Sequence, residues 1–175
     1  MDPSLQNRLS KINLLFLDND GVMTDGKIVY GDHGDELKYF DVQDGFGIVL
    51  ARRLGIRTVV VSGKSSRVNK RRAKDLGIEK FYERISDKLA VFEKLLKKYN
   101  LKPEEICCIG DDWLDIAPMR RAGVAVAVPN AVSEVRAVAQ WVTSRTGGSG
   151  AVREVIDAIL KAKGLYDDAV KLYDR

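Results

Sequence analysis

Short runs of consecutive apolar residues alternate with longer segments in which apolar residues recur every three or four positions. The runs lie near residues 12–17, 58–61, 81–82, 105–109, 124–128 and 141–142. Unbroken apolar runs closed by Gly, Ser or Asp are typical of strands buried on both faces of a parallel sheet. The periodic segments lie near residues 45–55, 66–76, 87–99, 112–121, 132–138 and 151–163, and they predict helices. The alternation predicts an α/β fold: a three-layer, Rossmann-like parallel sheet with helices on both faces and right-handed crossovers.

Residues 27–40 break this alternation. Two short alternating runs flank Gly31-Asp32-His33-Gly34, a pattern that predicts a protruding β-hairpin with His33 at its turn. An isolated two-stranded hairpin is marginally stable in water. We therefore expect it to pack on something outside the chain's own sheet, and a second copy of the chain is the simplest candidate.

Composition limits the remaining choices. We expect the 175 residues to form one domain, residues 1–175, with residues 164–175 as a short helical tail. No apolar run approaches the roughly 20 residues that span a bilayer, and the chain does not open on a secretory pattern. Cys107 and Cys108 are neighbours on one strand and point to opposite faces, so they predict reduced thiols and a cytoplasmic location. The net charge of +4 mildly favours anionic ligands.

The polar residues that carry chemistry come directly after buried strands. Asp18 and Asp20 follow the first strand, Ser62 follows the second, and Lys88 opens a later helix. Three more carboxylates follow the strand at 105–109: Asp111, Asp112 and Asp115. Parallel strands present their carboxyl ends at one edge of a sheet, where open α/β sheets bind ligands. Close carboxylates repel one another unless a cation or a shared proton lies between them, so the pattern predicts a metal site.

These residue types suit phosphoryl transfer through an aspartyl phosphate. Asp18 and Asp111 can supply carboxylate oxygens to Mg²⁺, a hard cation that prefers oxygen ligands. Ser62 can donate its hydroxyl to a phosphate oxygen, and Lys88 can neutralise phosphate and nucleophile. Asp20 can protonate the leaving alcohol and later deprotonate the attacking water. We therefore interpret Asp18, Asp20, Ser62 and Lys88 as the catalytic residues.

Four motifs make the chain resemble the haloacid dehalogenase-like phosphatases. They are Asp18-x-Asp20-Gly21-x-x-Thr24-Asp25-Gly26, Ser62-Gly63, Lys88, and Gly110-Asp111-Asp112-x-x-Asp115. Two further segments narrow the resemblance to the 3-deoxy-D-manno-octulosonate 8-phosphate (KDO 8-phosphate) phosphatase family: Asp41-Val42-Gln43-Asp44-Gly45 and Gly147-Gly148-Ser149-Gly150-Ala151-Val152-Arg153-Glu154. That family lacks a cap domain and forms homotetramers through the hairpin, with a neighbouring subunit closing each active site. The spacing between the motifs leaves no room for a cap domain here.

The resemblance implies Mg²⁺-dependent hydrolysis of KDO 8-phosphate in lipopolysaccharide precursor synthesis. It places Mg²⁺ on Asp18, Asp111 and the backbone carbonyl of Asp20, with Asp112 and Asp115 supporting the ligands. It also implies a set of substrate-binding residues: Asp20, Asp41, Val42, Gln43, Asp44, Gly45, Ser62, Gly63, Lys64, Arg72 and Lys88. Family members often carry Arg where this chain has Gln43 and Lys64, and often Arg or Lys where it has Ser149. Lys64 keeps the charge but loses bidentate geometry.

Other functions stay open at this stage. A nine-carbon sugar acid phosphate is the alternative substrate, although members of that group carry Glu at position 64. A phospho-acceptor signalling domain uses similar residues, but Asp20 is placed to destroy its phosphoaspartate. A catalytically silent assembly module has lower priority because every catalytic position is filled. The basic segment 64–74 has no interleaved aromatic residues, which disfavours nucleic-acid binding.

Overall fold

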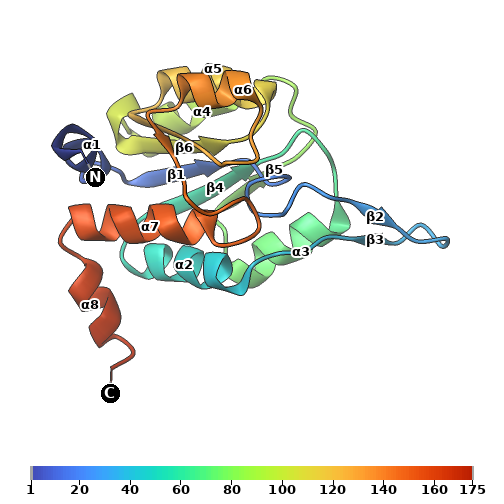
Figure 1. Ribbon diagram of the computed structural model, residues 1–175, viewed down its shortest axis with the longest axis horizontal. Helices are drawn as coiled ribbons and strands as arrows, with labels where there is room; N and C mark the ends of the chain where they lie inside the picture. The colour runs from blue at the N-terminus through green and yellow to red at the C-terminus, as the bar shows by residue number, and fades with distance from the viewer. Residues whose placement is uncertain (1, 175) are drawn as a thin grey trace.

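A six-stranded parallel sheet forms the centre of the molecule in a computed structural model, which describes residues 2–174 (Figure 1). The strand order is β5-β4-β1-β6-β7-β8. The strands are β1 Leu14–Leu17, β4 Arg57–Val61, β5 Lys80–Tyr82, β6 Ile106–Gly110, β7 Val124–Ala127 and β8 Trp141–Val142. Every pairing in this sheet is parallel. The predicted α/β architecture is therefore confirmed.

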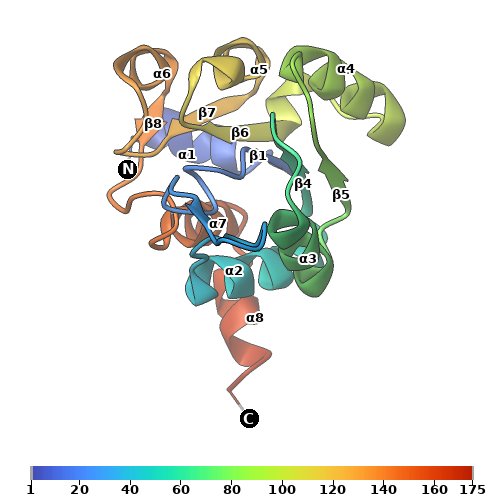
Figure 2. The same cartoon turned by 90° about the vertical axis from the view of Figure 1, so that its right-hand side faces the viewer.

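Helices cover both faces of the sheet, with α4, α5 and α6 on one side and α2, α3 and α7 on the other (Figure 2). The helices are α1 Pro3–Leu9, α2 Val42–Arg53, α3 Arg67–Leu76, α4 Lys88–Tyr99, α5 Ile116–Arg121, α6 Ser133–Val138, α7 Ala151–Ala162 and α8 Tyr166–Lys171. Two short 3-10 helices, η1 Pro103–Glu105 and η2 Trp113–Asp115, flank β6. Of the described helices, none combines the length and the apolar character that a membrane span needs.

The register of the central strands brings their ends level. Leu17 of β1 pairs with Val60 of β4 and with Ile109 of β6. All four residues of β1 and all five of β6 are buried, which explains their unbroken apolar character. Cys107 and Cys108 are both free and buried, as predicted. The residues that follow β1, β4 and β6 are consequently delivered to one edge of the sheet.

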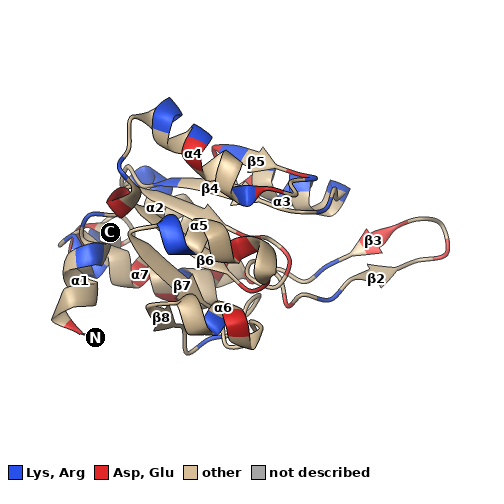
Figure 3. Cartoon of the chain, turned by 90° about the horizontal axis from the view of Figure 1, so that it is seen from above, with Lys and Arg blue, Asp and Glu red and all other residues tan. Residues whose placement is uncertain are grey.

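The hairpin lies outside this sheet. β2 (Val29–Tyr30) pairs antiparallel with β3 (Glu36–Leu37), and a bridge between Thr24 and Phe40 closes its base. Figures 1 and 3 show it projecting well beyond the sheet and helices. The hairpin predicted from the alternating pattern is confirmed.

One element begins earlier than expected. The apolar periodicity predicts a helix near residues 45–55, but α2 already starts at Val42. The reason is local: the carboxylate of Asp41 accepts the backbone N–H groups of Gln43 and Asp44, which caps the helix. The predicted tail helix is confirmed as α8, while Met1 and Arg175 lie outside the described residues.

Candidate active site

A buried lysine links two aspartates at the carboxyl edge of the sheet. Lys88 Nζ, at the first residue of α4, lies 2.5 Å from Asp18 Oδ1 and 2.7 Å from Asp115 Oδ1. Asp87 caps α4 through the backbone N–H of Ala90, which fixes the start of the helix and the lysine with it. Lys88 and Asp115 are almost completely buried, while the Asp18 side chain remains 10% exposed. Asp18 is therefore held in place and still open to a ligand.

Burial sets the protonation of these groups. It raises the pKa of Asp18 to about 7; Lys88 opposes this shift and the charge of Asp115 reinforces it. Burial also raises the pKa of Asp111 to about 8, with further contributions from Asp18 and Asp115. Burial works against the charged form of Lys88, but the two carboxylates outweigh it and raise its pKa above the usual value. Asp18 and Asp111 thus retain protons near neutral pH when no cation is bound, and a cation bound between the carboxylates would displace those protons.

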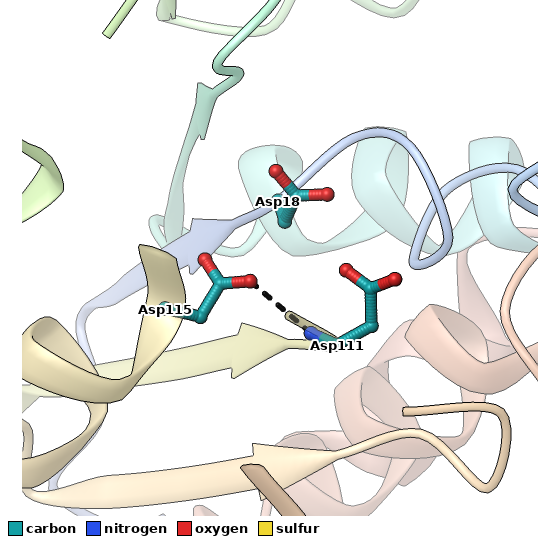
Figure 4. A group of neighbouring side chains, drawn as sticks. All are labelled: Asp18, Asp111 and Asp115. Carbon is teal, nitrogen blue, oxygen red and sulfur yellow. Dashed lines mark hydrogen bonds between the residues drawn. The ribbon is translucent and has the colours of Figure 1, made fainter. Parts of the chain in front are cut away.

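Asp18, Asp111 and Asp115 offer carboxylate oxygens within 4.8 Å of one another (Figure 4). Their available lone pairs differ. Asp115 Oδ1 accepts from Lys88, and its Oδ2 accepts the backbone N–H groups of Asp111 and Asp112. Asp111 Oδ1 is buried and has no hydrogen-bond donor among the described residues. Asp18 and Asp111 therefore fit a divalent cation as direct ligands, and Asp115 fits the supporting role predicted for it.

The Asp111 carboxylate lies against the backbone of the first motif. A Cβ at Gly21 would collide with the Asp111 carboxylate, and Gly21 has a φ of +104°. Only glycine allows this close approach without strain. Among the described residues, no group donates a hydrogen bond to the backbone carbonyl of Asp20. That oxygen is thus available for the metal contact that the sequence analysis assigned to it.

The Asp20 side chain has partners that the sequence analysis did not identify. Lys38 Nζ lies 2.5 Å from Asp20 Oδ1 and 3.0 Å from Glu36 Oε1. The amide of Asn19 donates to Asp20 Oδ1 at 3.1 Å. The amide of Asn69, on α3, lies 3.4 Å from Oδ2 and 3.5 Å from Oδ1. Lys38 lies in an arm of the hairpin and Asn69 lies on a basic helix. Neither belongs to a sequence motif, so the sequence alone does not identify them as site residues.

Ser62 directly follows β4 at the same edge and is buried. Its hydroxyl accepts the backbone N–H of Lys64 at 3.2 Å, and its position is fixed by backbone hydrogen bonds with Tyr82 and Ile85. The N-terminus of α3 follows at once, capped by Ser66. Backbone N–H groups and a serine hydroxyl at a helix start suit a phosphate oxygen.

Some of the predicted substrate-binding residues lie together, whereas Gln43 and Lys64 do not join them. Arg72 donates to the carbonyl of Asp41 at 3.1 Å and its guanidinium stacks over Phe40, so these residues do lie together. Gln43 instead accepts a hydrogen bond from Arg145 at 2.9 Å, and Lys64 is exposed. Asp112, which was predicted to support the metal ligands, is exposed as well, and its carboxylate caps η2 through the N–H of Trp113.

Asp44 has a structural role. It is buried, and its carboxylate accepts the backbone N–H groups of Gly150 and Arg153 at the start of α7. Burial raises its pKa to about 6, although these backbone hydrogen bonds oppose the shift. The two oxygens of Asp44 thus hold the start of α7 against α2, and the substrate contact that the resemblance implies for Asp44 stays a prediction.

The Gly-rich loop packs on the first motif. Gly147 lies against the carbonyl of Gly21, and a Cβ at Gly148 would collide with Thr24 and Asp25. Asn130 joins the two segments, because its amide donates to Gly21 O and its Oδ1 accepts from Gly147. Two of the motifs that sequence analysis selected are thus one packed unit.

Comparisons with known proteins agree with this geometry. Residues 74–156 match the model of a family of haloacid dehalogenase-like hydrolases. The chain is 40% identical to the KDO 8-phosphate phosphatase KdsC of Salmonella typhimurium over 97% of this chain and 90% of that protein. The enzyme from Moraxella catarrhalis, solved in complex with magnesium, phosphate and KDO, superposes with a TM-score of 0.96 at 38% identity, covering 99% of both chains. The cobalt-bound enzyme from Haemophilus influenzae superposes with a TM-score of 0.88 at 34% identity, covering 96% of both chains.

Proposed function

Because the chain belongs to the KDO 8-phosphate phosphatase family of haloacid dehalogenase-like hydrolases, we propose that it hydrolyses KDO 8-phosphate to KDO and inorganic phosphate. The observation that carries this proposal is the Asp18–Lys88–Asp111 arrangement. It combines the partly exposed carboxylate of Asp18, the ammonium of Lys88 and the carboxylate of Asp111, whose Oδ1 has no donor within residues 2–174. Magnesium, when bound there, neutralises charge on the transferring phosphoryl group.

In the first step, an oxygen of Asp18 attacks phosphorus and the bond from phosphorus to the C8 oxygen of the sugar breaks. Lys88 holds Asp18 in line and offsets negative charge on the phosphoryl oxygens, while Ser62 and the start of α3 bind those oxygens. Asp20, two residues from the nucleophile, gives its proton to the departing sugar oxygen. The products of this step are KDO and phospho-Asp18.

In the second step, water attacks phospho-Asp18. Asp20, now ionised, takes a proton from that water, and the bond between Asp18 and phosphorus breaks. Phosphate leaves, and Asp18 and Asp20 return to their starting forms. The atoms balance over the cycle: one water is consumed, and one phosphate and one KDO are released.

The test is a substrate panel with the purified protein and Mg²⁺. Phosphate release is expected to be fastest from KDO 8-phosphate and to stop when the metal is chelated. A faster reaction with a nine-carbon sugar acid phosphate would identify that compound as the substrate instead. Gln43 and Lys64 are the residues expected to distinguish between the two sugars. The absence of Mg²⁺-dependent release from every sugar acid phosphate would refute the enzyme assignment.

We also propose that the chain, acting as one domain, assembles as a tetramer through the hairpin. Four large apolar side chains of the hairpin are exposed: Tyr30 at 74%, Tyr39 at 69%, Leu37 and Val29. Such a patch on a protruding hairpin favours an interaction surface. Light scattering is expected to give about four times the chain mass of 19.5 kDa. A clean monomer would refute this assembly.

A further inference from the structure

Three segments meet on the carboxylate of Asp20, and two of them come from outside the first motif. Lys38 approaches from the returning arm of the hairpin, between β3 and the bridge at Phe40. Asn69 approaches from the first turn of α3. Asn19 completes the set from the motif itself. Asp20 is thus oriented by groups 18 and 49 positions away along the chain.

The side chain of Lys38 is covered by its surroundings, although the residue as a whole is half-buried. Its side chain has 0% exposure, although it stands on a hairpin that is otherwise open to solvent, and its ammonium is held between Asp20 and Glu36. Ordering a long lysine side chain and removing its charge from water both cost free energy. A surface lysine with no role would remain hydrated, so the position of Lys38 points to a task at Asp20.

Asn69 gives independent support. It is 1% exposed on a helix that is otherwise strongly basic, and its amide nitrogen faces both oxygens of Asp20. Its Oδ1 is buried and has no donor among the described residues. An unsatisfied buried amide oxygen costs about 1–3 kcal/mol, which an apolar side chain at this position would avoid. The amide is therefore better explained by its contact with Asp20 than by packing.

We propose that Lys38 and Asn69 are positioning residues for proton transfer, which act by fixing the direction of the Asp20 carboxylate. A consequence is that the hairpin arm forms part of the catalytic apparatus: the seating of the arm determines where Lys38 holds Asp20. This inference rests on the phosphatase function proposed above and extends it to residues outside the family motifs.

The experiment compares Lys38→Met, Lys38→Arg and Asn69→Leu with wild type on KDO 8-phosphate and on p-nitrophenyl phosphate. Misplacing a catalytic group lowers the reaction rate about 10²-fold. We therefore expect kcat for the sugar phosphate to fall by that order in Lys38→Met and by less in Asn69→Leu. KM is expected to stay within about twofold, because uniform substrate binding is untouched. Lys38→Arg restores the cation and is expected to recover most of kcat. Lys27→Met, an exposed lysine on the other hairpin arm, is the matched control and is expected to behave as wild type.

Rapid mixing with p-nitrophenyl phosphate separates the two steps. p-Nitrophenolate leaves without a proton, so Lys38→Met is expected to keep a burst of one product per active site, followed by slow turnover, because the water-attack step still needs Asp20. The double variant Lys38→Met/Asn69→Leu is expected to lose no more turnover than Asp20→Asn does, because Lys38 and Asn69 both act through the carboxylate of Asp20.

Two results would overturn the proposal: Lys38→Met with unchanged kcat, or burst and turnover reduced by the same factor, which is the signature of general structural damage. Thermal unfolding of each variant identifies any folding failure, in which case Asn69→Leu and Lys38→Arg decide the question. The p-nitrophenyl phosphate measurements do not depend on the sugar. A wild-type protein inactive on KDO 8-phosphate would refute the proposed substrate and leave the positioning test intact.

Discussion

Two lysines in this molecule are each held between two carboxylates, but their scaffolds differ. Lys88 lies between Asp18 and Asp115 at the start of α4, in the packed edge of the central sheet. Lys38 lies between Asp20 and Glu36 on the arm of a two-stranded hairpin. The first pair of contacts is rigid because the core fixes every partner. The second depends on where the hairpin is seated.

The two lysines hold residues with different roles: Lys88 holds the nucleophile, and Lys38 holds the residue that transfers protons. The nucleophile must not move relative to the phosphate, and its lysine comes from the most buried part of the fold. The proton shuttle serves two successive steps, and its lysine comes from the part of the chain that most needs a neighbour for support. Removing a member of each set should therefore have different consequences for stability and for catalysis.

The largest expected effect is at the nucleophile. Asp18→Asn removes the attacking oxygen's charge, and turnover of KDO 8-phosphate is expected to fall on the order of 10⁵-fold or more, as nucleophile deletions do elsewhere. Asn is nearly the same size, so the fold should persist. Phosphate release and circular dichroism measure the two effects. An Asp18→Asn variant with substantial activity would exclude the aspartyl-phosphate route.

The two lysines can be compared directly through stability. Lys88→Met leaves buried carboxylates without their cation and is expected to cost about 3–5 kcal/mol, since breaking a buried ion pair leaves an uncompensated charge. Lys38→Met is expected to cost less than about 1 kcal/mol, because Asp20 and Glu36 are each about one-fifth exposed and can be hydrated. Denaturant unfolding of both variants at pH 8 measures the difference. Equal losses would show that the hairpin lysine is as integral to the fold as the core one.

Magnesium and pH are expected to act on the core cluster and not on the hairpin. Asp18 and Asp111 hold protons in the metal-free native state up to about pH 7 and 8, whereas the unfolded chain releases them near 3.8. Native protein then binds more protons than unfolded protein, so metal-free stability falls as pH rises through this window.

Mg²⁺ binds the ionised carboxylates and is expected to raise the melting temperature more at pH 8 than at pH 6. At 100 times the dissociation constant, binding adds about 2.7 kcal/mol. Thermal scans with and without Mg²⁺ at both pH values measure this, with Asp111→Asn as the control that should lose the response. A shift that is larger at pH 6 would contradict the assignment of the metal ligands.

The smallest effect on folding is expected from the hairpin surface. Leu37→Glu places a charge on the exposed apolar patch, and its cost to the free energy of unfolding of the chain is expected to stay within about 0.5 kcal/mol. The mass in solution should nevertheless fall below that of the tetramer, with a drop in turnover. Light scattering measures the mass, and His33→Ala at the hairpin turn is the control. An unchanged mass would place the interface elsewhere.

Much of this architecture follows from local sequence patterns. The buried strands, the hairpin and the helices α3, α4 and α7 appear with small boundary shifts because apolar periodicity reports directly which faces are covered. The error at residues 41–45 has a local cause as well: Asp41 caps a helix, and the two glycines in the first turns of α2 concealed it. A Cβ at Gly45 would meet the guanidinium of Arg72, and one at Gly47 would come close to Arg153.

The reactive groups can be identified from local sequence patterns. Asp18, Ser62 and Asp111 follow strands of a parallel sheet, and that topology alone brings them to one edge. The contacts that each side chain makes at that edge depend on the tertiary fold. In the folded chain Asp44 holds the start of α7, and Lys38 and Asn69 contact Asp20. Asp111 Oδ1 has no donor in the part of the chain that the structure describes. These outcomes depend on pairings between segments far apart in the chain, and local propensity carries no information about such pairings.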